Sequence, residues 1–99
     1  MEKEIILLKE TIEKETGLVL ANVASINLLR NMLATYINEL ILNDFEKLVF
    51  ILYRIDINEK VIKKLLQQAT TVSAGETIAD AIIARETEKI ELRKKHTPN

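Results

Sequence analysis

The chain has 99 residues, with 14 Lys and Arg, 15 Asp and Glu, one His and no Cys, and its formal net charge is -1. This length fits one small domain over residues 1–99, and the composition is that of a globular protein. A net charge near zero gives no bulk preference for nucleic acid or for a membrane surface. The absence of Cys excludes disulfides, zinc thiolate sites and thiol nucleophiles, and a single His leaves no His-based metal cluster or triad.

The first residues, Met1–Glu4, lack the cationic region of a secretory signal, and the apolar run that follows is short. The longest stretch without a charged side chain runs from Thr16 to Leu29, which is 14 residues. A membrane span needs about 18 or more. We therefore expect a cytoplasmic protein that does not enter a membrane.

The first element is predicted as a helix over about 2–16. Ile5, Leu8 and Ile12 recur at the three- and four-residue spacing that places side chains on one helical face. Gly17 follows the last turn, and Gly is the residue that most often ends a helix.

The second helix is predicted over about 22–42, with Asn22 or Ser25 as its N-cap. Its apolar residues cover at least half of the circumference, as in a central helix that contacts several neighbours. The other face is a polar, nearly uncharged stripe made of Asn27, Arg30, Asn31, Ala34, Thr35 and Asn38. This stripe is either partly exposed or in contact with another helix or chain, where amides can pair without the desolvation cost of a charge.

Three later helix starts share a capping side chain placed three residues before a Glu, which is the spacing of a capping box. The pairs are Asn43 with Glu46, Asp56 with Glu59, and Ser73 with Glu76. They predict helices over about 44–55, 57–68 and 74–95. The run from Leu48 to Ile55 is apolar enough for a buried strand, but its cap and its helical neighbours favour a helix. The sequence thus predicts an all-α protein, a compact bundle of four or five helices.

The last predicted helix changes character midway. From Arg85 to His96 eight of twelve residues are charged, whereas its first half has an apolar face. We expect a charged helix end that leaves the core and a frayed tail from about residue 94.

Two segments, Asn43–Lys60 and Ile78–Glu86, resemble a group of short, uncharacterised all-helical bacterial proteins. The resemblance covers the C-terminal 55–60 residues. It implies a helical fold and brings no catalytic residues with it.

Paired carboxylates are the one candidate for catalysis or metal binding. Asp56 with Glu59 and Asp44 with Glu46 stand where helix caps are expected, and capping explains them. Glu39 could join Asp44 and Glu46 as an oxygen ligand, but no spacing requires it. We therefore predict that the protein is not an enzyme and has no cofactor or metal.

Two basic stripes indicate nucleic-acid binding as an alternative. Candidate phosphate contacts on the last helix are Arg85, Lys89 and Arg93, with His96 on the same stripe. The helix over 57–68 follows its predecessor after a short join, like a helix-turn-helix, and offers Lys60, Lys63, Lys64, Gln67 and Gln68. The missing Gly in the join and the net charge argue against this alternative.

Phe50 falls inside the narrow polar stripe of the helix over 44–55, between Glu46 and Arg54. Either this helix is buried on every side, or Phe50 is an exposed anchor that a second chain covers, with Glu46 and Arg54 as its polar rim. The candidate interface comprises Phe50, Glu46, Arg54, Asn27, Asn31 and Asn38. The sequence predicts a non-enzymatic protein interaction module, an adaptor or regulatory partner that forms a homodimer; the alternative is a small nucleic-acid-binding regulator.

Overall fold

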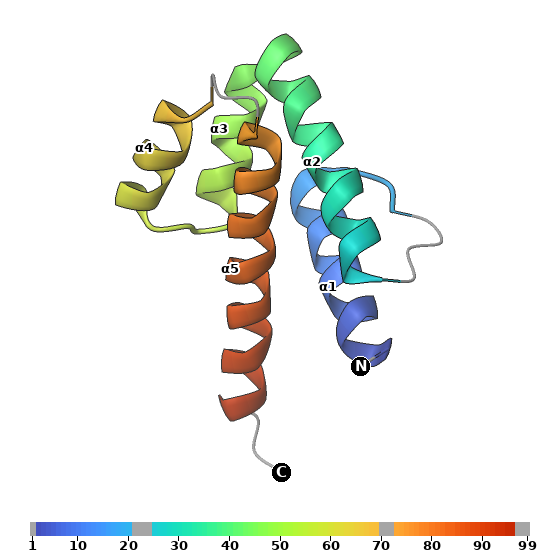
Figure 1. The fold of residues 1–99 in the computed structure, drawn as a ribbon. Coiled ribbons are helices and arrows are strands. Elements are labelled where there is room, and N and C mark those ends of the chain that lie inside the picture. Colours follow the sequence, from blue (N-terminus) through green and yellow to red (C-terminus); the bar gives the residue numbers. More distant parts are fainter. Residues whose placement is uncertain (1, 21–24, 70–72, 97–99) are drawn as a thin grey trace.

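The structure is a computed structural model that describes residues 2–20, 25–69 and 73–96. Within these residues the chain forms five helices and no strand, so the predicted all-α bundle is confirmed (Figure 1). The helices are α1 (Glu2–Thr16), α2 (Ile26–Asn43), α3 (Phe45–Arg54), α4 (Glu59–Gln67) and α5 (Ala74–His96).

The structure confirms one of the predicted N-cap residues and corrects two others. Ser25 caps α2, and its side chain accepts a hydrogen bond from the backbone N–H of Leu28; the other candidate, Asn22, lies outside the described residues. The cap of α3 is Asp44 rather than Asn43. The cap of α4 is Asn58 rather than Asp56.

Asp56 does not cap α4, because its backbone has a left-handed conformation with φ +67°. An N-cap needs extended backbone angles, so this residue cannot cap α4. It lies in the short connection between Arg54 and Glu59, where the chain turns; we call this connection the α3–α4 corner. At the other end of the chain, α5 continues to His96 and so covers residues 94–96, where a frayed tail was predicted; residues 97–99 lie outside the described part.

Helices α2 and α5 form the largest contact of the bundle, and α1 and α3 pack against this pair. Helix α4 lies at one edge, and the C-terminal end of α5 projects beyond α3 and α4 (Figure 1). Gly75, at the start of α5, allows the close approach of α2. A Cβ atom there would lie 2.6 Å from the carbonyl oxygen of Ala34, and would also meet the side chain of Asn38.

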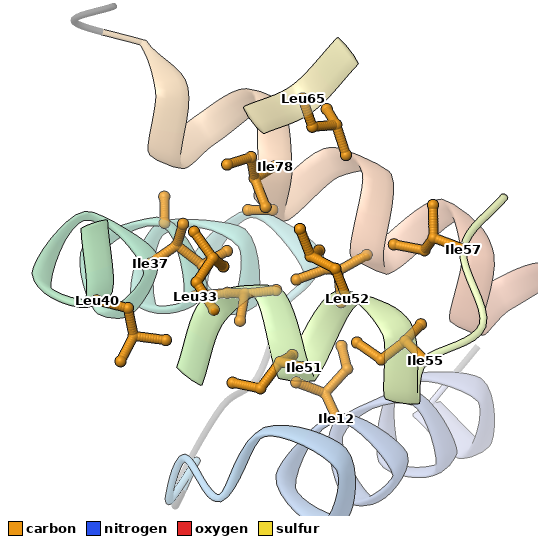
Figure 2. Close-up of a cluster of buried hydrophobic side chains, with 14 of the residues drawn as sticks. Ile12, Leu33, Ile37, Leu40, Ile51, Leu52, Ile55, Ile57, Leu65 and Ile78 are labelled. Atoms are coloured by element: carbon orange, nitrogen blue, oxygen red, sulfur yellow. The ribbon is translucent and has the colours of Figure 1, made fainter. Parts of the chain in front are cut away.

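The core is aliphatic. Its buried cluster consists of Leu, Ile and Ala side chains from all five helices and the adjoining loops. Figure 2 shows Ile12 of α1, Leu33 of α2, Leu52 of α3 and Ile78 of α5 around a common centre. No aromatic side chain belongs to this buried cluster among the described residues.

Candidate functional site

Most aromatic side chains of this protein are exposed and not part of the buried core. The chain has two Phe, two Tyr and no Trp. Three of these four lie on α3: Phe45, Phe50 and Tyr53 are 41%, 61% and 51% exposed. The fourth, Tyr36 of α2, is half-buried and donates a hydrogen bond of 3.0 Å to the carbonyl oxygen of Thr16. One ten-residue helix therefore presents most of the aromatic surface of the molecule.

Helix α3 has one buried aliphatic side and one exposed side that carries aromatic and charged residues. Leu48, Ile51 and Leu52 are buried and face the core. The opposite side carries Phe50 and Tyr53 together with Glu46 and Arg54, which are exposed and lie one helical turn before and after Phe50. We call this side the α3 outer face; it comprises Glu46, Phe50, Tyr53 and Arg54. Phe45 lies about 140° around the helix from Phe50, next to the buried side.

The exposure of the Phe50 side chain excludes one of its two explanations. A helix buried on every side is wrong, because 61% of the Phe50 side chain is exposed. The other explanation requires an exposed Phe50 in the single chain, with charged residues beside it, and the α3 outer face meets this requirement.

Arg54 is oriented by a contact inside the chain. Its Nε atom lies 3.0 Å from Oε2 of Glu15 on α1. The Arg54 side chain remains 49% exposed, whereas the Glu15 side chain is only 19% exposed. The pair therefore joins α1 to α3 and still presents a positive group at the end of the α3 outer face.

Part of the polar stripe of α2 contacts α5 of the same chain. Arg30 donates two hydrogen bonds to Asp80 of α5, one of them 3.1 Å long from Nη2. The hydrogen bond from Arg30 holds the pKa of Asp80 below its usual value, and the same pairing raises the pKa of Arg30. Ala34 is buried and Asn38 contacts the start of α5. Both alternatives for this stripe therefore hold in part: Arg30, Ala34 and Asn38 contact another helix, α5 of the same chain, whereas Asn27, Asn31 and Thr35 are exposed.

The two remaining asparagines of the candidate interface, Asn27 and Asn31, are exposed on α2, and Asn38 is also exposed despite its contact with α5. Nothing in the described residues joins them to the α3 outer face. The predicted set therefore divides into the α3 residues Glu46, Phe50 and Arg54, and a separate α2 group.

Two of the three candidate phosphate contacts are engaged at the α3–α4 corner. Arg85 donates from Nε to the carbonyl oxygen of Asp56 over 3.0 Å, and its Nη1 pairs with Glu88. Lys89 donates from Nζ to the carbonyl oxygen of Ile55 over 2.9 Å. Cations at this position stabilise the free carbonyls and the negative dipole end of a helix. Arg93 is exposed, farther along α5.

Sequence reasoning missed a buried carboxylate at the same place. The Glu86 side chain is fully buried, and its Oε1 lies 2.9 Å from Nζ of Lys89. This contact has the distance of an ion pair but not the geometry of a hydrogen bond, and neither carboxylate oxygen has a hydrogen-bond partner among the described residues. The signal was present in the sequence, because Glu86 lies four residues after Ile82 and four before Ile90, on the apolar stripe of α5.

An open pocket of about 580 Å³ lies between the start of α4 and the middle of α5. Val61, Ala81 and Ala84 supply apolar lining, and Asp56, Arg85 and Glu88 supply charged lining. Since Arg85 contacts both acidic residues, its charge is balanced within the pocket.

The basic residues of α4, Lys60, Lys63 and Lys64, are exposed, as are Gln67 and Gln68. The carboxylate pairs do not converge: within the described residues no group of three or more His, Asp or Glu side chains could hold a metal ion. Among the helices of the described part, none is both long and apolar enough to cross a membrane.

Comparison with protein-family models, with curated proteins and with solved structures gives no match. The resemblance of residues 43–60 and 78–86 to short helical bacterial proteins therefore stays a prediction.

Proposed function

We propose that this protein is a non-enzymatic helical interaction module, and that it associates with a second copy of itself through the α3 outer face. The proposal rests on one observation: three of the four aromatic residues are exposed on α3, while the buried core is aliphatic. Aromatic side chains are enriched at protein interfaces and are frequent hot spots of binding energy. In keeping with the sequence-based expectation, we take the module to act in the cytoplasm.

The size of the exposed aromatic surface supports this function. A buried aromatic side chain removes about 150–250 Å² from solvent. Phe50 and Tyr53 of the α3 outer face are each about half exposed, so covering them buries roughly 200 Å². Contiguous exposed apolar patches of a few hundred Å² are often binding sites.

We prefer this function to nucleic-acid binding because of the contacts of the basic residues. Arg85 and Lys89 already donate hydrogen bonds to backbone carbonyls at the α3–α4 corner. Phosphate contact by these side chains would compete with bonds that hold α5 to the corner. A gel-shift titration with mixed-sequence DNA at low and high salt tests the alternative, and salt-sensitive binding would support it.

The test of the proposed function is the molecular mass in solution over a wide range of protein concentration. We expect light scattering to show a rise from monomer to dimer for the unaltered protein. Phe50→Ala should shift this rise to about tenfold or higher concentration, since hot-spot residues contribute about 2 kcal/mol or more. The matched control is Leu92→Ala, which truncates an apolar residue that is 44% exposed on the far end of α5; it should leave association unchanged.

A monomeric mass at every concentration would overturn the proposed self-association. If Phe50→Ala and Leu92→Ala weakened the dimer equally, the proposal would also be wrong, because the dimer would then not form through the α3 outer face.

A further inference from the structure

We propose that the second copy binds in one defined orientation: the two α3 helices pair antiparallel about a two-fold axis at Phe50, and Glu46 of each protomer faces the partner's Arg54. This inference rests on the proposed function and adds the geometry of the assembly. It follows from the order of charges along the α3 outer face.

The charges of α3 are placed symmetrically about Phe50. Glu46 precedes it by four residues and Arg54 follows it by four, so each lies about one turn, or about 6 Å, from Phe50 along the helix. In an antiparallel pair centred on Phe50, a residue four positions before the centre faces one four positions after it. Two-fold symmetry produces this contact twice.

The alternative orientation is unfavourable for the same reason. In a parallel pair in register, Glu46 would face the partner's Glu46 and Arg54 would face the partner's Arg54. Like charges across an interface repel, and opposite charges fix register and orientation. The α3 outer face is therefore self-complementary in the antiparallel orientation only.

Both charged groups are accessible for such contacts. Glu46 is exposed in the first turn of α3. Arg54 uses its Nε atom in the contact with Glu15, and the side chain is still 49% exposed. A guanidinium can serve two carboxylates at once because its donors form a planar fork. The exposed part of the Arg54 side chain is therefore available to the partner's Glu46 while Nε stays with Glu15.

The small area of the interface between two α3 helices determines the affinity that we expect for the dimer. Helix α3 has ten residues and a length of about 15 Å. A standard stable interface covers about 800 Å² on each partner, and a single short helix supplies less than this. We therefore expect a dimer whose dissociation constant lies in the micromolar range, so that the mass changes with concentration.

The first test is charge reversal, measured by sedimentation equilibrium. Glu46→Arg alone and Arg54→Glu alone should each weaken self-association by about tenfold or more, because each places like charges opposite one another at both ends of the pair. An equal mixture of the two single variants should recover the affinity as a heterodimer. Lys64→Glu on α4 is the matched control for a change of charge sign on an exposed helix, and it should leave the affinity within about twofold.

The second test reads the orientation directly and does not depend on charge. The chain has no Cys, so Glu46→Cys and Arg54→Cys each carry one thiol. In the antiparallel pair two equivalent positions are about 12 Å apart along the axis, too far for a disulfide, whereas positions 46 and 54 of opposite chains are neighbours. Under mild oxidation a mixture of the two variants should form disulfide-linked heterodimers, and each variant alone should form few linked dimers.

The outcomes separate this inference from the proposed function. A protein that stays monomeric contradicts both. If association depends on Phe50 but each Cys variant alone forms linked dimers efficiently, the helices pair in parallel and the antiparallel orientation is wrong, while the proposed function stands. Circular dichroism of every variant checks that the helical fold is retained, so that a loss of association reports on the interface.

Discussion

The Nζ atom of Lys89 on α5 lies 2.9 Å from the carbonyl oxygen of Ile55 at the end of α3. The same nitrogen lies 2.9 Å from Oε1 of the buried Glu86. One cation thus supplies a donor to the C-terminus of α3 and offsets a carboxylate that has lost its contact with water. The corner between α3 and α4 and the middle of α5 are therefore held together by polar contacts as well as by apolar packing.

Removing this cation should destabilise the fold. Lys89→Met leaves the Glu86 carboxylate buried without a counter-charge, and we expect the free energy of unfolding to fall by roughly 3 kcal/mol in urea denaturation. The double variant Lys89→Met with Glu86→Leu should recover most of this loss, because replacing a buried ion pair by apolar side chains is often neutral. Lys95→Met, at the exposed end of α5, is the control and should change stability by less than about 0.5 kcal/mol. A double variant less stable than Lys89→Met would contradict this account.

Gly75 should not tolerate even a methyl group. In a helix Ala is favoured over Gly by about 1 kcal/mol, so helix propensity alone predicts stabilisation by Gly75→Ala. The new Cβ would lie 2.6 Å from the carbonyl oxygen of Ala34, and overpacking of this kind costs about 1–3 kcal/mol. We expect a net loss in thermal or chemical denaturation, and Asn38→Ala in the same chain should not remove it, since the carbonyl oxygen stays in place. A gain in stability would show that α2 and α5 can separate at little cost.

The pair of Arg30 and Asp80 should make stability depend on pH in the acidic range. The hydrogen bond from Arg30 is the main cause of the lowered pKa of Asp80 in the folded protein. A carboxyl with a depressed folded pKa contributes stability above its unfolded pKa of about 3.9, and this contribution is lost as the pH falls through the folded pKa. Asp80→Asn should therefore lower the melting temperature at pH 7, and this effect should shrink as the pH falls below about 3.9. The difference at pH 7 should shrink at high salt, because the pair is exposed.

Asn58, and not Asp56, should behave as the cap of α4. Asn58 accepts a hydrogen bond of 2.8 Å from the backbone N–H of Lys60, and Asn58→Ala should cost about 1 kcal/mol. Asp56 has a positive φ, which Gly adopts without strain and Ala does not. In urea titrations Asp56→Gly should therefore be more stable than Asp56→Ala. An Asn58→Ala variant as stable as the unaltered protein would contradict this assignment of the cap.

The caps show how far sequence patterns reach. Apolar periodicity and capping signals predicted four or five helices, and the bounds of α1 agree with the structure. Where two neighbouring residues can both cap, as with Asn43 and Asp44, local sequence cannot choose between them. At Asp56 the choice depended on the path of the chain, because the corner needs a left-handed residue before α4 can begin.

The site was predictable to a similar extent. The helical wheel singled out Phe50 between Glu46 and Arg54, but whether its ring lies in the core or on the surface depends on how α3 packs, which a wheel does not contain. For the same reason Arg85 and Lys89 looked available for phosphates until α5 was placed beside the α3–α4 corner. Glu86 was visible on the apolar stripe of α5, but its counter-charge is known only from the packed structure.

The last prediction separates the surface role of Phe50 from a role in the core, and it compares two residues of the same helix. Phe50 is 61% exposed and Leu52 is fully buried. At a protein concentration below that of self-association, Phe50→Ala should change the free energy of unfolding by less than about 1 kcal/mol, because it removes little buried surface. Leu52→Ala should cost about 2–5 kcal/mol, since it leaves a cavity between α2, α3 and α5. Urea denaturation of dilute protein measures both. Repeating it at high concentration should add the contribution of the dimer to the unaltered protein and to Leu52→Ala, but not to Phe50→Ala. If Phe50→Ala loses as much stability as Leu52→Ala in dilute solution, the ring belongs to the core, and the aromatic surface of α3 needs another explanation.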